Sequence, residues 1–128
     1  MRYLLDTNIL SQQDIDPKAR AWIMQHQGQI ALASITIAEI AQGIERLLQS
    51  KRCAQLATFL QEVLDDYPVI AFGTNEALAW GHYVAKAGRP LPVRDSLIAA
   101  TALANNLEVV TGNAKDFPGV EVVNPVKD

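Results

Sequence analysis

Residues that commonly build disulfide bonds and zinc sites are scarce in this 128-residue chain, which has one cysteine, Cys53, and two histidines, His26 and His82. A single cysteine cannot form an internal disulfide, and these three residues do not supply the four ligands of a Cys/His zinc site. We therefore expect any metal in this protein to be held by oxygen ligands.

Long apolar runs, aromatic residues and an excess of positive charge are lacking as well. The longest apolar-looking stretch, IALASITIA, is far shorter than the ~20 residues of a membrane helix, and the first residues do not have the pattern of a signal peptide. We therefore expect a cytoplasmic protein with no membrane association. The net charge of −3 argues against a protein that coats nucleic acid through positive charge alone, and no aromatic cluster suggests base stacking.

What the chain does contain is an alternation of two patterns. Short runs rich in Val, Ile and Leu are typical of buried strands, and longer stretches have the spacing of amphipathic helices. The strand-like runs are residues 2–5, 29–33, 68–72, 107–111 and 120–123, and the helical stretches are 17–27, 36–49, 53–66, 75–88 and 94–106. Strands separated by helices predict a three-layer α/β fold, a parallel sheet of about five strands flanked by helices, in one domain covering residues 1–128.

Acidic residues recur at one edge of this predicted sheet, where the carboxyl ends of the strands meet the amino ends of the following helices and where ligands bind. Asp6 directly follows the first strand, and Asp116 follows the fourth strand after a short loop. Glu39 and Asp95 lie near the starts of two helices. Such a group of acids requires a positive partner among them, and oxygen ligands suit Mg²⁺ or Mn²⁺.

Two of these acids also have the residue type and position of helix caps. Asp6 is a good capping residue if a short helix begins at Ile9. Thr36 and Glu39 match the capping-box pattern S/T-x-x-E, which satisfies backbone groups at a helix start.

The other acids have structural interpretations too. Asp95 suits the positive end of a helix dipole, and Asp116 could be an ordinary loop acid. By position at the edge, Glu76 is also a candidate site acid, because it begins the helix after the third strand. Choosing among these acids therefore requires the strand order or a recognisable motif.

Four segments of the sequence together resemble the PIN-domain ribonucleases, and among these the VapC and FitB toxins of bacterial toxin–antitoxin pairs. The segments are LLDTNILS, SITIAEIAQGI, RDSLIAATAL and TGNAKDFPGVEVVNP, which follow the family's order and extend from Arg2 to about Pro125. The resemblance implies the sheet order 3-2-1-4-5, which brings the ends of strands 1 and 4 together and leaves Glu76 at the sheet's margin. It also implies an endoribonuclease that hydrolyses RNA phosphodiester bonds with Mg²⁺ or Mn²⁺.

The resemblance assigns metal binding and catalysis to three core acids, Asp6, Glu39 and Asp95. Small polar residues beside them are expected to support the site, and these are Thr7, Asn8, Ser34, Thr36, Thr111 and Asn113.

A fourth acid is open between two positions of the last motif. Some relatives have an acid where this chain has Asn113, and others have one where it has Asp116; many have Arg in place of Gly112. We predict that Asp116 is the fourth catalytic acid and metal ligand, brought back toward the metal by one helical turn that a buried Phe117 anchors. We predict that Asn113 mainly orders the loop through backbone hydrogen bonds.

The charge balance is compatible with an RNA substrate, such as tRNA or rRNA. Without the four proposed site acids, 11 basic residues face 10 acidic ones. Basic residues that flank the proposed site are candidates to hold phosphates, and these are Lys86, Arg89, Arg94 and Lys115. The resemblance further implies a cognate antitoxin and a homodimer, for which the helices at 36–49 and 53–66 offer an apolar face.

Two functions of other classes fit parts of the pattern. A receiver-like phosphoacceptor domain also gathers acids and Mg²⁺ at this edge, but it needs an acidic pair after the first strand, where this chain has only Asp6. The other is a PIN-like domain that has lost its activity and serves as a binding module. The presence of Asp6, Glu39 and Asp95 argues against that module, because a carboxylate cluster without a metal is costly.

Overall fold

The computed structural model describes residues 1–47 and 52–127, and its centre is a five-stranded parallel sheet in the order β3-β2-β1-β4-β5. The strands are β1 Tyr3–Leu5, β2 Ile30–Ala33, β3 Val69–Ile70, β4 Glu108–Val110 and β5 Val122–Val123. All five predicted strands are therefore confirmed, together with the strand order that the resemblance implied. β1 lies in the middle of the sheet, between β2 and β4.

The predicted helices are confirmed, the helical turn predicted before Phe117 is present, and a short helix follows Asp6. The helices are α1 Thr7–Gln12, α2 Pro17–Gln25, α3 Ser34–Arg46, α4 Arg52–Asp66, α5 Thr74–Ala87 and α6 Val93–Ala104, with a 3₁₀ turn, η1, at Ala114–Asp116. α1 begins at Thr7, directly after Asp6. The predicted end of the helix at residues 48 and 49 lies outside the described residues.

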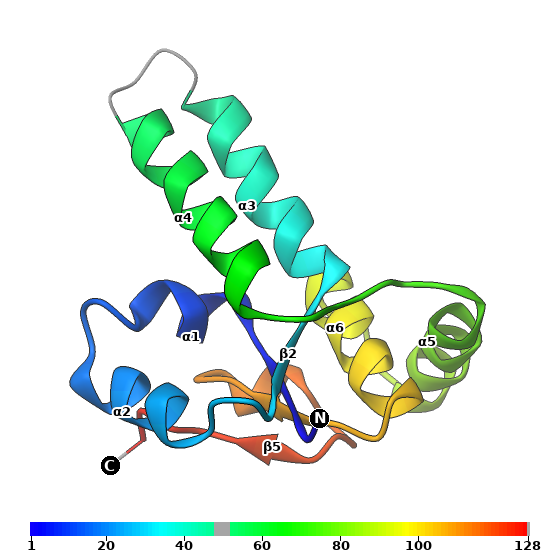
Figure 1. The fold of residues 1–128 in the computed structure, drawn as a ribbon. Coiled ribbons are helices and arrows are strands. Elements are labelled where there is room, and N and C mark those ends of the chain that lie inside the picture. The colour runs from blue at the N-terminus through cyan, green and yellow to red at the C-terminus, as the bar shows by residue number, and fades with distance from the viewer. Residues whose placement is uncertain (48–51, 128) are drawn as a thin grey trace.

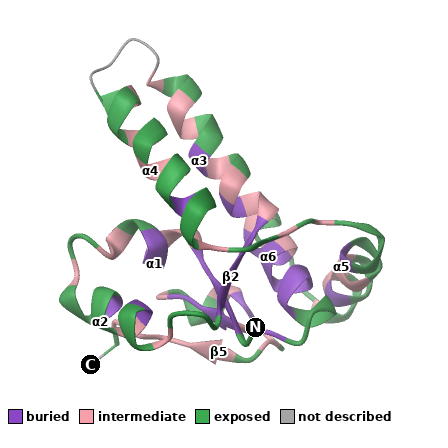
Figure 2. Ribbon diagram, in the orientation of Figure 1, coloured by how far each residue is buried: buried purple, intermediate pink, exposed green. Residues whose placement is uncertain are grey.

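Two apolar clusters cover the two faces of the sheet and make it the middle of three layers. Successive residues of β1 point to opposite faces, so Tyr3 and Leu5 join one cluster and Leu4 joins the other. The first cluster includes residues of α1 to α4, and the second includes residues of α5 and α6. Figure 2 shows the resulting concentration of buried residues in the central strands and α6, with exposed residues on the outer faces of α4 and α5.

α3 and α4 pack together and project away from the sheet as a pair (Figure 1). Their close approach depends on Gly43, because a Cβ atom there would lie 3.0 Å from the Leu56 side chain. Val63, near the end of α4, is the buried residue that joins this helix to the core. Among the described residues, no helix has the length and apolar content needed to cross a membrane.

Candidate active site

Asp6 lies at the point where the two halves of the sheet meet. The Asp6 backbone N–H donates to the carbonyl of Val110 over 2.9 Å, so the pairing of β1 with β4 continues up to this residue. The Asp6 side chain is fully buried, and its Oδ2 accepts a hydrogen bond of 2.8 Å from the Thr111 hydroxyl. Asp6 occupies the N-cap position of α1, but its side chain makes no capping hydrogen bond to that helix. The capping interpretation of Asp6 therefore does not account for its carboxylate.

The second carboxylate oxygen of Asp6 is buried without a hydrogen-bond partner. The closest charge recorded for this Oδ1 is the Arg94 guanidinium, whose Nη2 lies 3.9 Å away. Burial raises the pKa of Asp6 above its ordinary value, although the Thr111 hydrogen bond and the charge of Arg94 partly oppose this rise. A buried carboxylate oxygen in this state is suited to bind a cation.

Glu39 faces Asp6 from α3, and its contacts show that it is not a helix cap. The helix begins at Ser34, two residues before the predicted capping Thr36, so Glu39 lies in its second turn. Its Oε1 accepts a 2.7 Å hydrogen bond from the Thr7 hydroxyl, and its Oε2 accepts one of 2.8 Å from Arg94. The capping-box interpretation of Thr36 and Glu39 is therefore wrong.

Asp95 and Arg94 are neighbours in the first turn of α6, and both point into the group of acids. The Arg94 Nε and Nη2 atoms both donate to Oδ1 of Asp95, while Nη1 donates to Glu39. Burial tends to lower the pKa of Arg94, but its hydrogen bonds to Glu39 and Asp95 outweigh this effect and raise the pKa above its ordinary value. Arg94 is therefore a permanent positive charge among three carboxylates.

This placement changes the expectation for Arg94, which the sequence nominated as an RNA-binding residue. Its guanidinium binds acids of the same chain in this structure. The sequence argument did require something positive among the acids, but the residue next to Asp95 was not recognised as that partner. The adjacency of Arg94 and Asp95 at a helix start was the signal that could have identified it.

The loop after β4 has the predicted shape, with one turn of 3₁₀ helix at Ala114–Asp116. The Phe117 ring is 2% exposed, and the Asp116 N–H donates to the Asn113 carbonyl over 3.0 Å. The Asn113 N–H in turn donates to the Thr111 hydroxyl, which also holds Asp6. Asn113 therefore orders the loop through its backbone, as predicted. Asp116 is partly buried in the same loop.

The small polar residues that were predicted to support the site differ in what they contact. Thr7 and Thr111 support the acids directly, since their hydroxyls donate to Glu39 and Asp6, and Thr36 lies behind Thr7 with its hydroxyl 3.2 Å away. The Asn8 Oδ1 is buried without a hydrogen-bond partner. Ser34 differs, because its hydroxyl accepts from the Phe72 backbone and so joins α3 to the segment after β3.

The remaining basic candidates are exposed. Arg89, in the loop between α5 and α6, donates to the Lys115 backbone carbonyl over 3.1 Å. Lys86 and Lys115 are exposed. These three residues therefore remain available to a ligand that approaches the acids.

Glu76 tests how far position in the sequence can be trusted, since it also lies near the start of a helix that follows a strand. Its two carboxylate oxygens accept from the Gly73 N–H over 2.9 Å and from the Asn105 side chain over 3.0 Å. Glu76 therefore caps α5 and joins it to the end of α6. Its strand, β3, is at the margin of the sheet, as the resemblance implied.

The donor atoms at the centre suit a hard divalent cation, because they are carboxylate oxygens and one of them lacks a partner. Among residues 1–47 and 52–127, no three His, Cys, Asp or Glu side chains converge as a set of metal ligands. The Arg94 guanidinium explains this arrangement, since it lies between Glu39 and Asp95 and pairs with both. The residues fit a metal once this guanidinium has moved aside.

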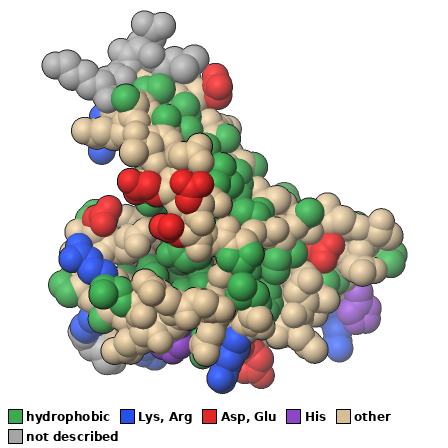
Figure 3. All heavy atoms as spheres, in the orientation of Figure 1, with side chains coloured by type: hydrophobic (Ala, Val, Ile, Leu, Met, Phe, Trp, Pro, Cys, Tyr) green, Lys and Arg blue, Asp and Glu red, His purple; other side chains and the backbone are tan. Residues whose placement is uncertain are grey.

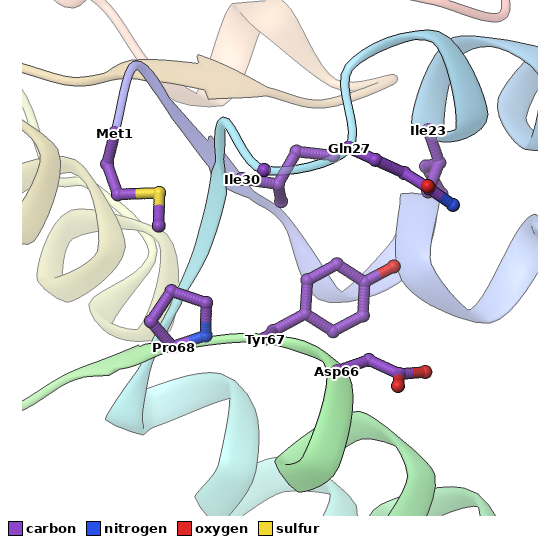
Figure 4. Close-up of a pocket in the computed structure, with 8 residues that line it drawn as sticks. Met1, Ile23, Gln27, Ile30, Asp66, Tyr67 and Pro68 are labelled. Atoms are coloured by element: carbon purple, nitrogen blue, oxygen red, sulfur yellow. The ribbon is translucent and has the colours of Figure 1, made fainter.

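A cavity of about 390 Å³ lies at the opposite edge of the sheet (Figure 4). Met1 precedes β1, Ile30 begins β2, and Tyr67 and Pro68 precede β3, so this cavity is at the amino ends of the strands. Its one charged lining residue is Asp66. Figure 3 shows acidic side chains where α4 meets the body of the molecule, and the exposed acids there include Glu62, Asp65 and Asp66. This region is unsuited to a phosphate backbone.

Comparison with known proteins gives the same family from sequence and from structure. A family model described as PIN domain matches residues 3–122. The chain is 30% identical, over the whole of both proteins, to Ribonuclease VapC from Rickettsia bellii. It is 29% identical to the tRNA(fMet)-specific endonuclease VapC from Shigella flexneri, covering 94% of this chain and 92% of that protein. A chain from the structure of a toxin-antitoxin complex from Klebsiella pneumoniae superimposes with a TM-score of 0.76 at 27% identity, covering 98% of this chain and 99% of that one. The chain belongs to the PIN-domain family, in its VapC ribonuclease branch.

Proposed function

We propose that this protein is a metal-dependent endoribonuclease that hydrolyses RNA phosphodiester bonds, and that it is the toxin of a toxin–antitoxin pair. The observation that carries the proposal is that one guanidinium, Arg94, lies within 4 Å of carboxylate oxygens of Asp6, Glu39 and Asp95, which come from three separate parts of the chain. Membership of the VapC branch supports an RNA substrate. An RNA substrate also implies a cytoplasmic location.

Asp6 and Asp95 are the principal metal ligands in this proposal, with Glu39 and Asp116 completing the set directly, through water or as a general base. Bound Mg²⁺ or Mn²⁺ would lower the pKa of a water molecule and offset negative charge on the phosphate. Thr7 and Thr111 hold Glu39 and Asp6 by hydrogen bonds and so fix the direction of their carboxylates. A carboxylate not engaged by the cation can accept the proton of the attacking water.

The basic residues beside the acids define where RNA lies. Lys86, Arg89 and Lys115 hold phosphates on either side of the bond that is cleaved. The relative that acts on tRNA(fMet) makes initiator tRNA the first substrate to test.

Two protein partners complete the proposal. The similar chain in a toxin–antitoxin complex supports a cognate antitoxin that blocks the site. A second copy of the chain pairs through the α3–α4 arm, where Ile37, Leu56 and Phe59 are partly buried and supply apolar surface.

The test is cleavage of purified tRNA, including initiator tRNA, and of rRNA fragments with Mg²⁺, with Mn²⁺ and with excess EDTA. We expect cleavage with either metal, no cleavage with EDTA, and loss of cleavage in Asp6→Asn and Asp95→Asn. Full cleavage in EDTA would contradict the metal mechanism. A folded wild-type protein that binds RNA but cleaves none of these substrates would favour the inactive binding module.

Glu39 and Glu76 supply a pair of variants, since both are acids near the start of a helix that follows a strand, and only Glu39 contacts Arg94. We expect Glu39→Gln to lower the cleavage rate by at least ten-fold, because this residue contacts the site. Glu76→Gln should keep the rate within a few-fold of wild type, because it caps α5. Thermal melts of both variants separate lost stability from lost chemistry. Equal rates in the two variants would remove Glu39 from the proposed site.

A further inference from the structure

The Arg94 side chain occupies the space among the proposed metal ligands. Its guanidinium donates to Oε2 of Glu39 and to Oδ1 of Asp95, and it lies 3.9 Å from Oδ1 of Asp6. These three acids come from different elements, and Arg94 is the cation that contacts all of them. The guanidinium is therefore a counter-ion of these three acids.

Most carboxylate oxygens of Asp6, Glu39 and Asp95 already accept a hydrogen bond. Glu39 uses one oxygen to accept from Thr7 and the other to accept from Arg94. Asp95 receives two hydrogen bonds from Arg94 on one oxygen. Oδ1 of Asp6 is the carboxylate oxygen identified as buried without a partner. An arriving cation thus meets one free buried ligand and two that a guanidinium already binds.

A divalent cation and this guanidinium cannot share the position. Both are positive and both approach the same three carboxylates, so their repulsion would be strong in a partly buried site. The Arg94 side chain is 38% exposed, so one side of it already faces solvent. Rotation of this long side chain would release the acids without moving α6.

We propose that Arg94 is an internal counter-ion that a divalent metal must displace before it can occupy the site. This inference rests on the proposed metal-dependent function. Arg94 neutralises these acids and thereby keeps them close together. The same contacts weaken metal binding, because each cation that binds must first break the pairs with Glu39 and Asp95.

The test measures Mn²⁺ affinity directly, by electron paramagnetic resonance and calorimetry, on protein without RNA. We expect Arg94→Gln to bind Mn²⁺ at least ten-fold more tightly than wild type. Arg94→Lys keeps the positive charge but has one ammonium group in place of the forked guanidinium. Its Mn²⁺ affinity should therefore lie between those of wild type and Arg94→Gln. Arg2→Gln is the matched control, because it removes an arginine that pairs with Glu108 at the opposite edge of the sheet. Its Mn²⁺ affinity should equal that of wild type within two-fold.

Thermal melts in EDTA and in Mn²⁺ give a second measurement. Without metal, Arg94→Gln should melt at a lower temperature than wild type, because its acids lose their counter-ion. Added Mn²⁺ should then raise its melting temperature more than it raises that of wild type. If Arg94→Gln fails to fold, Arg94→Lys is compared with wild type in the same two measurements, and the expected differences are smaller.

The outcomes separate this inference from the proposed function. Binding of Mn²⁺ by wild type with equal or weaker binding by a folded Arg94→Gln would overturn the displacement model and leave the metal site in place. Absence of Mn²⁺ binding in wild type and in both Arg94 variants would overturn the metal site and the displacement model together. Unchanged binding in Asp6→Asn would place the bound ion outside these acids and overturn both as well.

Discussion

At the scale of the residue, Asp6 is fully buried, and neighbouring groups balance its negative charge only in part. Thr111 satisfies one carboxylate oxygen, while the other is left to a guanidinium 3.9 Å away. Such a charge is costly in a folded protein unless a ligand or a proton neutralises it. The buried charge of Asp6 therefore lowers the stability of the fold and leaves a carboxylate oxygen available to bind a cation.

This cost has a definite pH dependence in the metal-free protein. The pKa of Asp6 is raised above its ordinary value of 3.8 by burial, so the folded protein holds this proton more tightly than the unfolded chain does. The resulting stabilisation is fully present below pH 3.8 and is lost as the pH rises through the folded pKa. Each unit of the shift corresponds to about 1.4 kcal/mol at neutral pH.

Asp6→Asn should therefore stabilise the metal-free protein at neutral pH while it abolishes cleavage. Asparagine does not titrate, so the melting temperature of the variant minus that of wild type should grow as the pH is raised from about 4 to about 8. Melts in EDTA across this range measure the difference. A gap that stays constant, or that shrinks with rising pH, would show that burial of the Asp6 charge does not limit stability.

The fourth acid is the second prediction at this scale. Asp116 is partly buried beside the turn that Phe117 anchors, whereas Asn113 is exposed and bonds through its backbone. We expect Asp116→Asn to raise the Mg²⁺ concentration needed for half-maximal cleavage by about ten-fold, since loss of a ligand charge weakens cation binding. Asn113→Ala should leave this concentration nearly unchanged. Thermal melts check that both variants fold, and the reverse order at equal stability would exchange the two roles.

At the scale of the element, the sequence predicted which segments form strands and helices better than it predicted where they begin. Apolar runs located every strand, although only β1 and β2 are buried at every residue, while β3 and β5 at the margins of the sheet are partly exposed. The start of α3 was missed by two residues, since Thr36 and Glu39 have the residue types of a cap while Thr36 actually lies inside the helix. Their side chains turn toward Thr7, which is a tertiary contact across 29 and 32 residues of sequence. Periodicity within one helix contains no information about such a contact.

The strand order could not be derived from periodicity either. It came from the resemblance of four motifs, and it is what separates Glu39 from Glu76 in space. The direction of Arg94 was also beyond the sequence, because a basic residue at a helix start can face solvent or neighbouring acids equally well. Only the assembled structure shows the acids that it meets.

Two helical glycines allow a prediction about packing. Gly81, within α5, has open space where a Cβ would lie, so Gly81→Ala should stabilise the fold by about 0.5–1 kcal/mol. Gly43→Ala should gain less or destabilise, because its Cβ would be 3.0 Å from the Leu56 side chain in the α3–α4 contact. Urea denaturation measures both free energies of unfolding. An equal gain at the two positions would mean that Leu56 moves aside without cost.

At the scale of the whole molecule, the two edges of the sheet differ in what they offer to RNA. At the carboxyl ends of the strands, Lys115 follows β4 and Arg89 contacts its backbone, while the amino ends of the strands border the acidic end of α4. The net charge of −3 gives no indication that the two edges of the sheet differ in charge. A phosphate chain should therefore approach from one side.

Arg89 and Arg2 test this polarity as a matched pair of arginines on opposite edges. In an Asp6→Asn background, which prevents cleavage, Arg89→Gln should weaken tRNA binding several-fold and Arg2→Gln should not. The slope of log affinity against log salt should also become shallower by about 0.7 for Arg89→Gln if it removes one contact to single-stranded RNA. Fluorescence anisotropy over a salt series measures both quantities. Equal losses in the two variants would point to general charge effects.

The sheet order has one more consequence, which concerns the making of the protein. β1 pairs on one side with β2 and on the other with β4, so the acids of the first half, Asp6 and Glu39, meet Asp95 only where the two halves of the chain join. On a ribosome, the early strands emerge long before α6 and β4 exist. A nascent chain therefore has half a catalytic centre until its last third has been translated, and a prematurely terminated fragment lacks the other half.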